Sequence, residues 1–457
     1  MSTSITSSVP LVRAQREPGG IAEVATLAWP AVLQTLSDTL MQVTDSVIVG
    51  RLGVTELAAV GFGGIWFWTL ACPLVGAATG VQTFVAQAHG AREPRSCGPW
   101  AWQGLSALLP LALVWFALVA VAMAPFFGFL GGSPELHARA VEYAHGRAWG
   151  GPAIVANVVL SSFFRGLGDT RTPLVATILA NLLNACLAYS LVFGALGLPA
   201  MGVAGAGIAT AIATWVYTAV VFAAFRRARL ARQYATQPVA PDLARIFRLL
   251  RVSSPIGGQW LLDMVSFALF TTLIARMGDR SMAASHAMVQ LLSLSFMQAV
   301  GIAIASGALV GRYVGARDLE AAARSHRSAL KLGVALAMVV AALFLGAPGF
   351  LLRLFTDDPE VLVVGGPLLV LGAVFQLVDA LGIIAGGSLR GAGDTRWPFL
   401  VQATLAWALR IPLVYLMAVV LSGGVFGAWL GELGYITVLG TVLVTRFHRG
   451  RWRTLRI

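Results

Sequence analysis

Twelve apolar segments, each about as long as a membrane-spanning helix, follow one another along this chain of 457 residues. A helix needs roughly 20 consecutive apolar residues to cross the hydrocarbon core of a bilayer. The expected spans are residues 21–49, 56–87, 100–127, 138–164, 172–194, 200–226, 246–275, 281–313, 322–348, 360–389, 397–420 and 423–446. The segments predict an all-α integral membrane protein with twelve transmembrane helices.

The composition excludes a water-soluble fold. Only 11% of the residues are charged and 58% are hydrophobic, whereas a soluble globular chain carries about 25% charged residues. The net charge of +12 comes from arginines in short connections, with no basic face that carries interleaved aromatic residues, so we expect no nucleic-acid partner. The three cysteines lack the spacing of a metal site or a disulfide framework.

The positions of the basic residues predict the orientation and the domains. Most lysines and arginines lie in the two tails and in the even-numbered connections, which places both termini in the cytoplasm. The predicted domains are a polar N-terminal tail (1–20), an N-lobe (21–226), a basic linker (227–245), a C-lobe (246–446) and a basic C-terminal tail (447–457). The linker is expected to contact phospholipid without specificity.

The two halves of the chain repeat at a constant offset of 225 residues. The matching segments are Pro30 with Pro255, 49–53 with 274–278, 90–93 with 315–318, and 165–171 with 390–396. Six helices per half is an even number, so the halves are parallel repeats whose interface lies at the centre of the bundle. Two pseudo-symmetric six-helix lobes that rock against each other are the expected architecture.

One repeated motif lies in connections between helices. The sequence R-G-x-G-D-T-R occurs at 165–171 and at 390–396. Its glycines permit a tight turn, and its Asp or Thr can cap the next helix. We interpret the motif as a structural hinge and not as a set of substrate ligands.

Six charged residues are expected deep in the membrane, away from the ends of the predicted spans: Asp38, Asp45, Asp263, Asp379, Arg410 and Glu432. A charge at bilayer depth costs on the order of 2.5–3.5 kcal/mol on insertion scales, so such residues usually have a function. Asp38 and Asp263 are equivalent in the repeat, and Gln34 and Gln259 precede them by one helical turn. Each half thus offers an amide and a buried carboxylate that could bind a proton, Na⁺ or an organic cation, the alternative being a polar contact between helices.

The other charges have no counterpart in the repeat. Asp45 corresponds to Phe270, and Asp379 corresponds to Ile154. Two carboxylates in one apolar cavity cannot both ionise cheaply, so the acids of the second half are expected to hold a proton or an ion. Arg410 is expected to pair with one of the two acids Asp263 and Asp379. Glu432, with small neighbours, could instead serve helix packing.

The sequence favours secondary transport as the function. A proton that crosses 100 mV yields roughly 2.3 kcal/mol, and no G-x-x-x-x-G-K-[ST] loop is present for ATP. No arrangement of a nucleophile and a base is visible, so an enzymatic activity is not expected. We expect no cofactor apart from the coupling ion, H⁺ or Na⁺.

Several segments resemble the multidrug and toxic compound extrusion (MATE) family, most closely its NorM-type bacterial branch. Residues 43–53 are similar to the family's V-D-T…G-x-L-G segment, which gives Asp45 the position of the N-lobe acid. Asp263 stands where the family usually has a Glu. Residues 375–379, followed by 389–391, resemble the motif that carries the second cation-site acid, here Asp379. Residues 202–210 match the sixth helix.

The resemblance implies export of cationic or amphipathic small molecules through a cleft between two lobes, in exchange for H⁺ or Na⁺. It also implies a bacterial inner-membrane protein that contacts lipid, and we expect a monomer. One departure is at position 188 in the fifth helix, where the family usually has Asn or Asp. This chain has Ala188 there, after Asn181 and Asn184. This departure is expected to weaken the N-lobe network around Asp45, so coupling, and any Na⁺ site, is predicted in the C-lobe.

Two other functions remain open from the sequence. A flippase for lipid-linked precursors on a related two-lobe scaffold would need a strongly cationic cleft to hold pyrophosphate. A structural or receptor membrane protein without transport would have no need for intramembrane acids. The acidic character of the deep charges favours the antiporter.

Overall fold

The computed structural model describes residues 17–130, 134–353 and 359–455. Most of the predicted N-terminal tail and the last two residues of the C-terminal tail lie outside this range. The elements are α1 (Ile21–Gly50), α2 (Val54–Thr79), α3 (Val81–Gly90), α4 (Pro94–Leu130), α5 (Pro134–Ala148), α6 (Gly151–Gly166), α7 (Arg171–Phe193), α8 (Gly202–Phe225), α9 (Ala228–Tyr234), α10 (Leu243–Ala275), α11 (Asp279–Gly315), α12 (Leu319–Gly346), α13 (Pro348–Arg353), α14 (Pro359–Ala392), α15 (Arg396–Leu405), η1 (Ala406–Arg410), α16 (Ile411–Tyr415), η2 (Leu416–Val420), α17 (Gly424–His448) and η3 (Arg451–Thr454).

The predicted all-α fold with its twelve spans is confirmed in the described part of the chain. Two spans are broken, one between α2 and α3 at Gly80 and one between α5 and α6 at 149–150. The span from α15 to η2 contains two π-helical turns. Within the described residues, ten helices are long and apolar enough to cross a membrane by length and composition alone. The remaining two spans are α1, which carries acidic residues, and the pair α5–α6, whose first member is polar.

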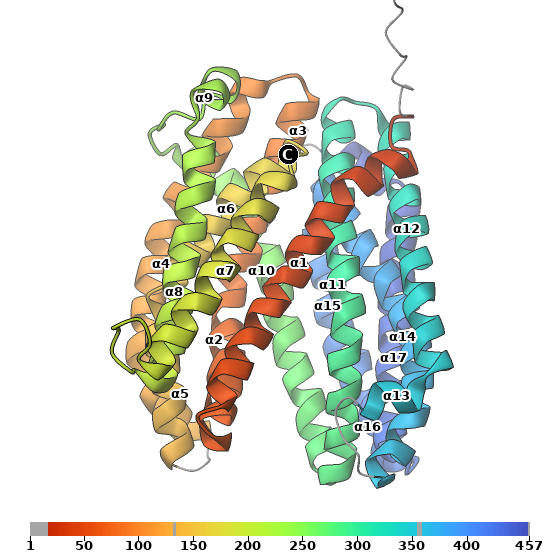
Figure 1. Cartoon of the computed structure of the whole chain (residues 1–457). Coiled ribbons are helices and arrows are strands. Elements are labelled where there is room, and N and C mark those ends of the chain that lie inside the picture. The colour runs from red at the N-terminus through yellow and green to blue at the C-terminus, as the bar shows by residue number, and fades with distance from the viewer. Residues whose placement is uncertain (1–16, 131–133, 354–358, 456–457) are drawn as a thin grey trace, which may run out of the picture.

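The helices form two lobes, built from α1–α8 and from α10–α17 (Figure 1). The repeat is visible in the backbone. Gly168 and Gly393 turn the chain at φ values of 85° and 90°, and Arg92 and Arg317 adopt φ values of 62° and 60°. The left-handed region disfavours side chains with a Cβ, so its use at matched positions shows that the two halves share the same turns.

Helix α1 crosses from one lobe to the other (Figure 1). Its first turns pack against α11 and α12, where Val24 and Ala28 share an apolar cluster with residues of both helices. Near its other end Asn184 of α7 donates a hydrogen bond to Asp45 of α1. Helix α10 does the reverse, since Gly257 lies against the backbone of Pro73 in α2. Each lobe therefore begins with a helix whose first turns pack on the other lobe.

The lobes are joined by hydrogen bonds at one end of the bundle. Gln82 donates to the carbonyl of Ile304 at 2.9 Å, and Thr83 donates to the carbonyl of Arg390 at 2.9 Å. Gln87 donates to the carbonyl of Gly391 at 3.1 Å. Figure 1 shows α3, α9 and the C-terminus at this same end. Any motion that opens this end must break these three bonds.

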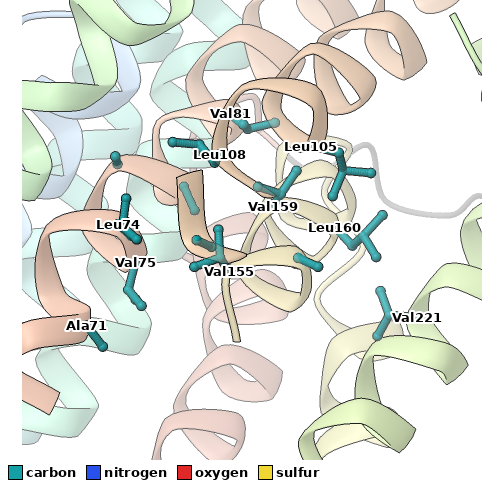
Figure 2. Close-up of a cluster of buried hydrophobic side chains, with 14 of the residues drawn as sticks. Ala71, Leu74, Val75, Val81, Leu105, Leu108, Val155, Val159, Leu160 and Val221 are labelled. Carbon is teal, nitrogen blue, oxygen red and sulfur yellow. The ribbon is translucent and has the colours of Figure 1, made fainter. Parts of the chain in front are cut away.

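The N-lobe has a tightly packed apolar core (Figure 2). Side chains from α2, α3, α4, α6 and α8 meet there, among them Leu74, Val81, Leu108, Val155 and Val221. Lipid tails are as apolar as these side chains, so close van der Waals packing holds the helices together. The core fixes the positions of α7 and α8 relative to α1, and these three helices carry the polar groups described next.

Candidate ion and substrate sites

A polar cluster lies inside the N-lobe around Asp45. Asn184 Nδ2 of α7 donates to Asp45 Oδ1 at 2.6 Å, and Thr210 Oγ1 of α8 donates to Asp45 Oδ2 at 2.8 Å. All three residues are buried, with exposures of 2%, 0% and 2% for Asp45, Asn184 and Thr210. Asn184 Oδ1 is buried with no hydrogen-bond partner among the described residues. The cluster offers a carboxylate, a hydroxyl and a free amide oxygen, which are ligands suited to a small hard cation.

Ala188 changes this cluster less than the sequence suggests. It is fully buried against Leu191 and Ala209 and contributes only a methyl group. Asp45 nevertheless keeps two donors from two helices. The departure at position 188 therefore removes one potential polar group and leaves the network around Asp45 in place.

Gln34 is held by other partners than the expected carboxylate. Arg165 Nη2 of α6 donates to Gln34 Oε1 at 2.9 Å. Gln34 Nε2 donates to the Tyr217 hydroxyl at 3.2 Å, and Tyr217 shares a hydrogen bond of 2.8 Å with Ser161. Gln34 thus links α1, α6 and α8.

The two aspartates that are equivalent in the repeat differ in their surroundings. Asp38 is exposed and accepts no hydrogen bond from the described residues, because Gln34 points to Arg165 and Tyr217 instead. Asp263, its repeat equivalent, is half-buried. The acid buried in the N-lobe is Asp45, two turns after Asp38.

The C-lobe equivalent is a chain of two amides and a carboxylate. Gln259 Nε2 donates to Gln402 Oε1 at 2.9 Å, and Gln402 Nε2 donates to Asp263 Oδ1. The expected pairing of Gln259 with Asp263 is thus indirect, through α15. Asp379 of α14 is half-buried and accepts no hydrogen bond from the described residues.

Arg410 pairs with Glu432. Its Nε and Nη2 each donate to a Glu432 carboxylate oxygen at 2.7 Å, and its Nη1 donates to Ser266 Oγ at 2.7 Å. The two side chains are only 7% and 5% exposed. The π-helical turn η1 ends at Arg410, and the guanidinium also lies 5.2 Å from the centre of the Tyr435 ring. The sequence pointed to Asp263 or Asp379 as the partner of Arg410, and the structure instead shows Glu432 as the partner. Asp263 and Asp379 therefore have no bonded cation among the described residues.

A cavity of about 240 Å³ adjoins this ion pair. It is lined by Ser266, Leu269, Phe270, Thr272, Leu273, Arg276, Arg410, Ile411, Val414 and Tyr415. Across the described residues, no group of three or more His, Cys, Asp and Glu side chains gathers as a metal site. The C-lobe acids therefore form an extended polar region and not a compact cage.

The repeated R-G-x-G-D-T-R motif is more than a hinge. Asp169 caps α7, as expected, because its Oδ1 accepts from the backbone N–H groups of Arg171 and Thr172 at 3.1 and 3.0 Å. Asp394, its equivalent, instead pairs with Arg446 at 2.8 Å. The first arginine of the N-lobe copy, Arg165, reaches into the bundle to Gln34. The inventory of deep charges from the sequence therefore missed Arg165, which is half-buried.

The sequence also missed Thr210, Tyr217 and Gln402. All three are uncharged, and a search for ionisable residues passes over them. Gln402 alone has a signal in the sequence, since an amide in the apolar span 397–420 needs a partner. Their partners come from other helices and cannot be read from local spacing.

Comparison with known proteins agrees with this geometry. The family model described as MatE matches residues 30–190 and 255–416, so it matches each half once. The chain is 31% identical to "Probable multidrug resistance protein NorM" of Burkholderia mallei over 94% of this chain and 92% of that relative. It is 28% identical to a protein of the same name from Thermotoga maritima, again over 94% and 92%. The crystal structure of the eukaryotic MATE transporter AtDTX14 matches with a TM-score of 0.86 at 19% identity, over 94% of this chain and 96% of that one.

The fold and the polar clusters define a two-lobe membrane transporter. The chain belongs to the MatE family, in its NorM-type branch. The resemblance inferred from the sequence motifs is thereby confirmed.

Proposed function

We propose that the chain is a secondary active antiporter that exports organic cations and amphipathic drugs in exchange for H⁺ or Na⁺. The observation that carries this proposal is the presence of separate acidic clusters in two lobes that are hydrogen-bonded to each other at one end of the bundle. The name of the bacterial relatives, multidrug resistance protein, supports drugs as the substrate class. Rocking of the lobes would expose the acids to each side of the membrane in turn.

The coupling ion is proposed to bind in the C-lobe at Asp263 and Asp379. Asp379 has no hydrogen-bond donor among the described residues, and Arg410 is held by Glu432. The two acids therefore lack a bonded counter-ion and can take up a proton or Na⁺ from solution. Gln259 and Gln402 would orient Asp263 during this exchange.

The N-lobe cluster is a second candidate for the coupling site. The unpartnered amide oxygen of Asn184 beside the Asp45 carboxylate favours it. Protonation of Asp45 would weaken its bonds to α7 and α8, and this would loosen the second half of α1. The separate clusters of the two lobes would allow one lobe to bind the drug and the other to bind the coupling ion.

The proposed setting is the bacterial inner membrane, with both termini in the cytoplasm. The basic residues of the connections support this orientation. It makes the end that carries Gln82, Thr83 and Gln87 the cytoplasmic end. Because the three hydrogen bonds between the lobes would close the cytoplasmic end, the described conformation would be open toward the outside. The proposed partners are small cationic or amphipathic molecules and membrane lipid, and the transporter is proposed to act as a monomer without enzymatic chemistry.

A lipid-linked precursor flippase is the competing function. Its cleft would need several unpaired cations for a pyrophosphate group. Arg410 is neutralised by Glu432, and Arg165 is bonded to Gln34. The acids Asp38, Asp263 and Asp379 have no bonded cation, which favours a cationic substrate.

Ethidium efflux from cells that lack other pumps tests the proposal. Asp263→Asn and Asp379→Asn should each abolish efflux while the protein remains in the membrane, and Asp45→Asn should retain part of it. Wild-type efflux by both C-lobe variants would move the coupling site to Asp45. Proteoliposomes with an imposed pH gradient or an imposed Na⁺ gradient would then identify the ion.

A further inference from the structure

The segment between α8 and α10 forms a basic pocket at the membrane boundary. The span of α8 ends at Phe225 and that of α10 begins at Leu243. A cavity of about 360 Å³ opens between them, lined by Arg226, Ala228, Ala231, Arg232, Gln237 and Pro238. Two guanidinium groups and an amide thus share one hollow with three small apolar side chains.

The walls of this pocket are fixed by hydrogen bonds. The carbonyl of Thr236 accepts from Trp102 Nε1 of α4 at 3.1 Å and from Arg226 Nη1 at 3.3 Å. Gln103 Nε2 donates to the carbonyl of Ala240 at 3.0 Å, and Gln103 Oε1 accepts from the Asp242 backbone N–H at 2.8 Å. The segment after α9 is therefore clamped onto α4, and the pocket is preformed.

The charge of the pocket is not neutralised from within the protein. Residues 226–251 contain seven arginines and one acid, Asp242. Asp242 is already engaged, because it caps α10 and pairs with Arg245 at 3.3 Å. In the described part of the chain no carboxylate pairs with Arg226 or Arg232, and both are exposed. Two arginines without a carboxylate partner thus line one hollow, and guanidinium groups are well suited to bind a phosphate group.

We propose that this pocket binds the headgroup of an anionic phospholipid. The phosphodiester would lie between Arg226 and Arg232, with Gln237 available to a headgroup hydroxyl. Ala228, Ala231 and Pro238 would contact the glycerol and the first acyl carbons. The apolar surface continues along the chain, since Val239 is 39% exposed and Leu243 is 81% exposed. This position at the ends of two spans distinguishes a lipid from a soluble phosphate, which would need no apolar wall.

The test uses the purified full chain in detergent, titrated with dioleoylphosphatidylglycerol or dioleoylphosphatidylcholine and read by native mass spectrometry. The variant is Arg226→Gln with Arg232→Gln. The matched control is Arg449→Gln with Arg451→Gln, which removes the same charge from exposed arginines at the C-terminal end. Each cation near an anionic lipid contributes about fivefold in affinity, so the pocket variant should bind phosphatidylglycerol roughly 30-fold more weakly. The control should change affinity little.

A second variant keeps the charge and removes the space. Ala231→Trp fills the pocket and should lose phosphatidylglycerol to the same extent, while its melting temperature in phosphatidylcholine stays that of the wild type. Glycerol 3-phosphate in excess should not displace the lipid. Equal losses in the pocket and control variants, normal binding by Ala231→Trp, or displacement by glycerol 3-phosphate would each overturn the proposal.

Discussion

Gly90 of α3 and Gly315 of α11 lie where these helices pack together, at the end where the two lobes are hydrogen-bonded. Each glycine lies against a backbone carbonyl of the other half. A Cβ atom at Gly90 would collide with the carbonyl oxygen of Arg312, and a Cβ atom at Gly315 would collide with that of Gln87. Residues 87 and 312 are themselves equivalent in the repeat of 225. The lobes therefore meet in a reciprocal contact between α3 and α11 that only glycine permits.

Replacement of either glycine by alanine should weaken this closure. Overpacking of a tight contact costs about 1–3 kcal/mol, so Gly90→Ala and Gly315→Ala should each lower the melting temperature and favour the conformation in which this end is open. A cysteine introduced beside Gly315 should then react faster with a membrane-impermeant thiol reagent from the cytoplasmic side. Gly61→Ala is the control, because a Cβ there meets no atom within 4 Å. Unchanged labelling in both variants would show that this contact does not hold the lobes together.

The sequence predicted the scaffold well because the scaffold depends on local features. The length of apolar runs places each span, and the offset of 225 places each turn, as Gly168 and Gly393 show. The breaks inside spans were not predicted. At Gly80 the helix is interrupted where a Cβ would collide with Ser253 of α10, and this constraint arises only from the packing of the other lobe.

Asn184→Ala should reduce transport in part and by no more than Asp45→Asn does, because it leaves the buried carboxylate of Asp45 with the one donor Thr210. A hydrogen bond to a charged group contributes about 1.5–3 kcal/mol, so a loss of stability should accompany the partial loss of efflux. Asn181→Ala is a close control. Asn181 also lies on α7 and donates to α1, through the Ser37 carbonyl at 2.7 Å, but it does not contact Asp45. Equal efflux in the two variants would remove Asn184 from the functional cluster.

The ion pair of Arg410 and Glu432 should behave as a unit. Loss of one partner leaves an unpaired buried charge, so Arg410→Leu and Glu432→Leu should each destabilise the protein by about 3–5 kcal/mol. The double variant should recover most of this stability. Thermal unfolding in detergent measures all three. The exposed pair of Arg139 and Glu142, 41% and 43% exposed, provides the control, where Arg139→Leu should change stability by about 0–1 kcal/mol. A double variant as unstable as the singles would mean that packing, and not charge, is lost.

The candidate site was predictable only in part, for a physical reason. The sequence alone shows an ionisable residue in an apolar span, and Asp45, Asp263 and Asp379 were identified in this way. The hydrogen-bond partner of such a residue is known only from the three-dimensional structure. The sequence paired Gln34 with Asp38 by helical spacing, yet Arg165, 131 residues away, takes the amide oxygen instead. Spacing along a helix shows which residues share a face, and the neighbouring helices decide what that face meets.

Gln402 should be essential to the C-lobe acids although it is uncharged. Gln402→Leu removes both the donor to Asp263 and the acceptor of Gln259. Asp263 then loses the only hydrogen bond that it accepts from the described residues, and efflux should fall by roughly tenfold or more. Gln402→Glu, which can still accept from Gln259 but places a second acid beside Asp263, should impair efflux as well. Thr404→Val is the control, since Thr404 is exposed and, among the described residues, its hydroxyl donates only to the Leu400 carbonyl of its own helix. Normal efflux by Gln402→Leu, with wild-type amounts of protein in the membrane, would show that the amide chain only packs helices and does not orient Asp263.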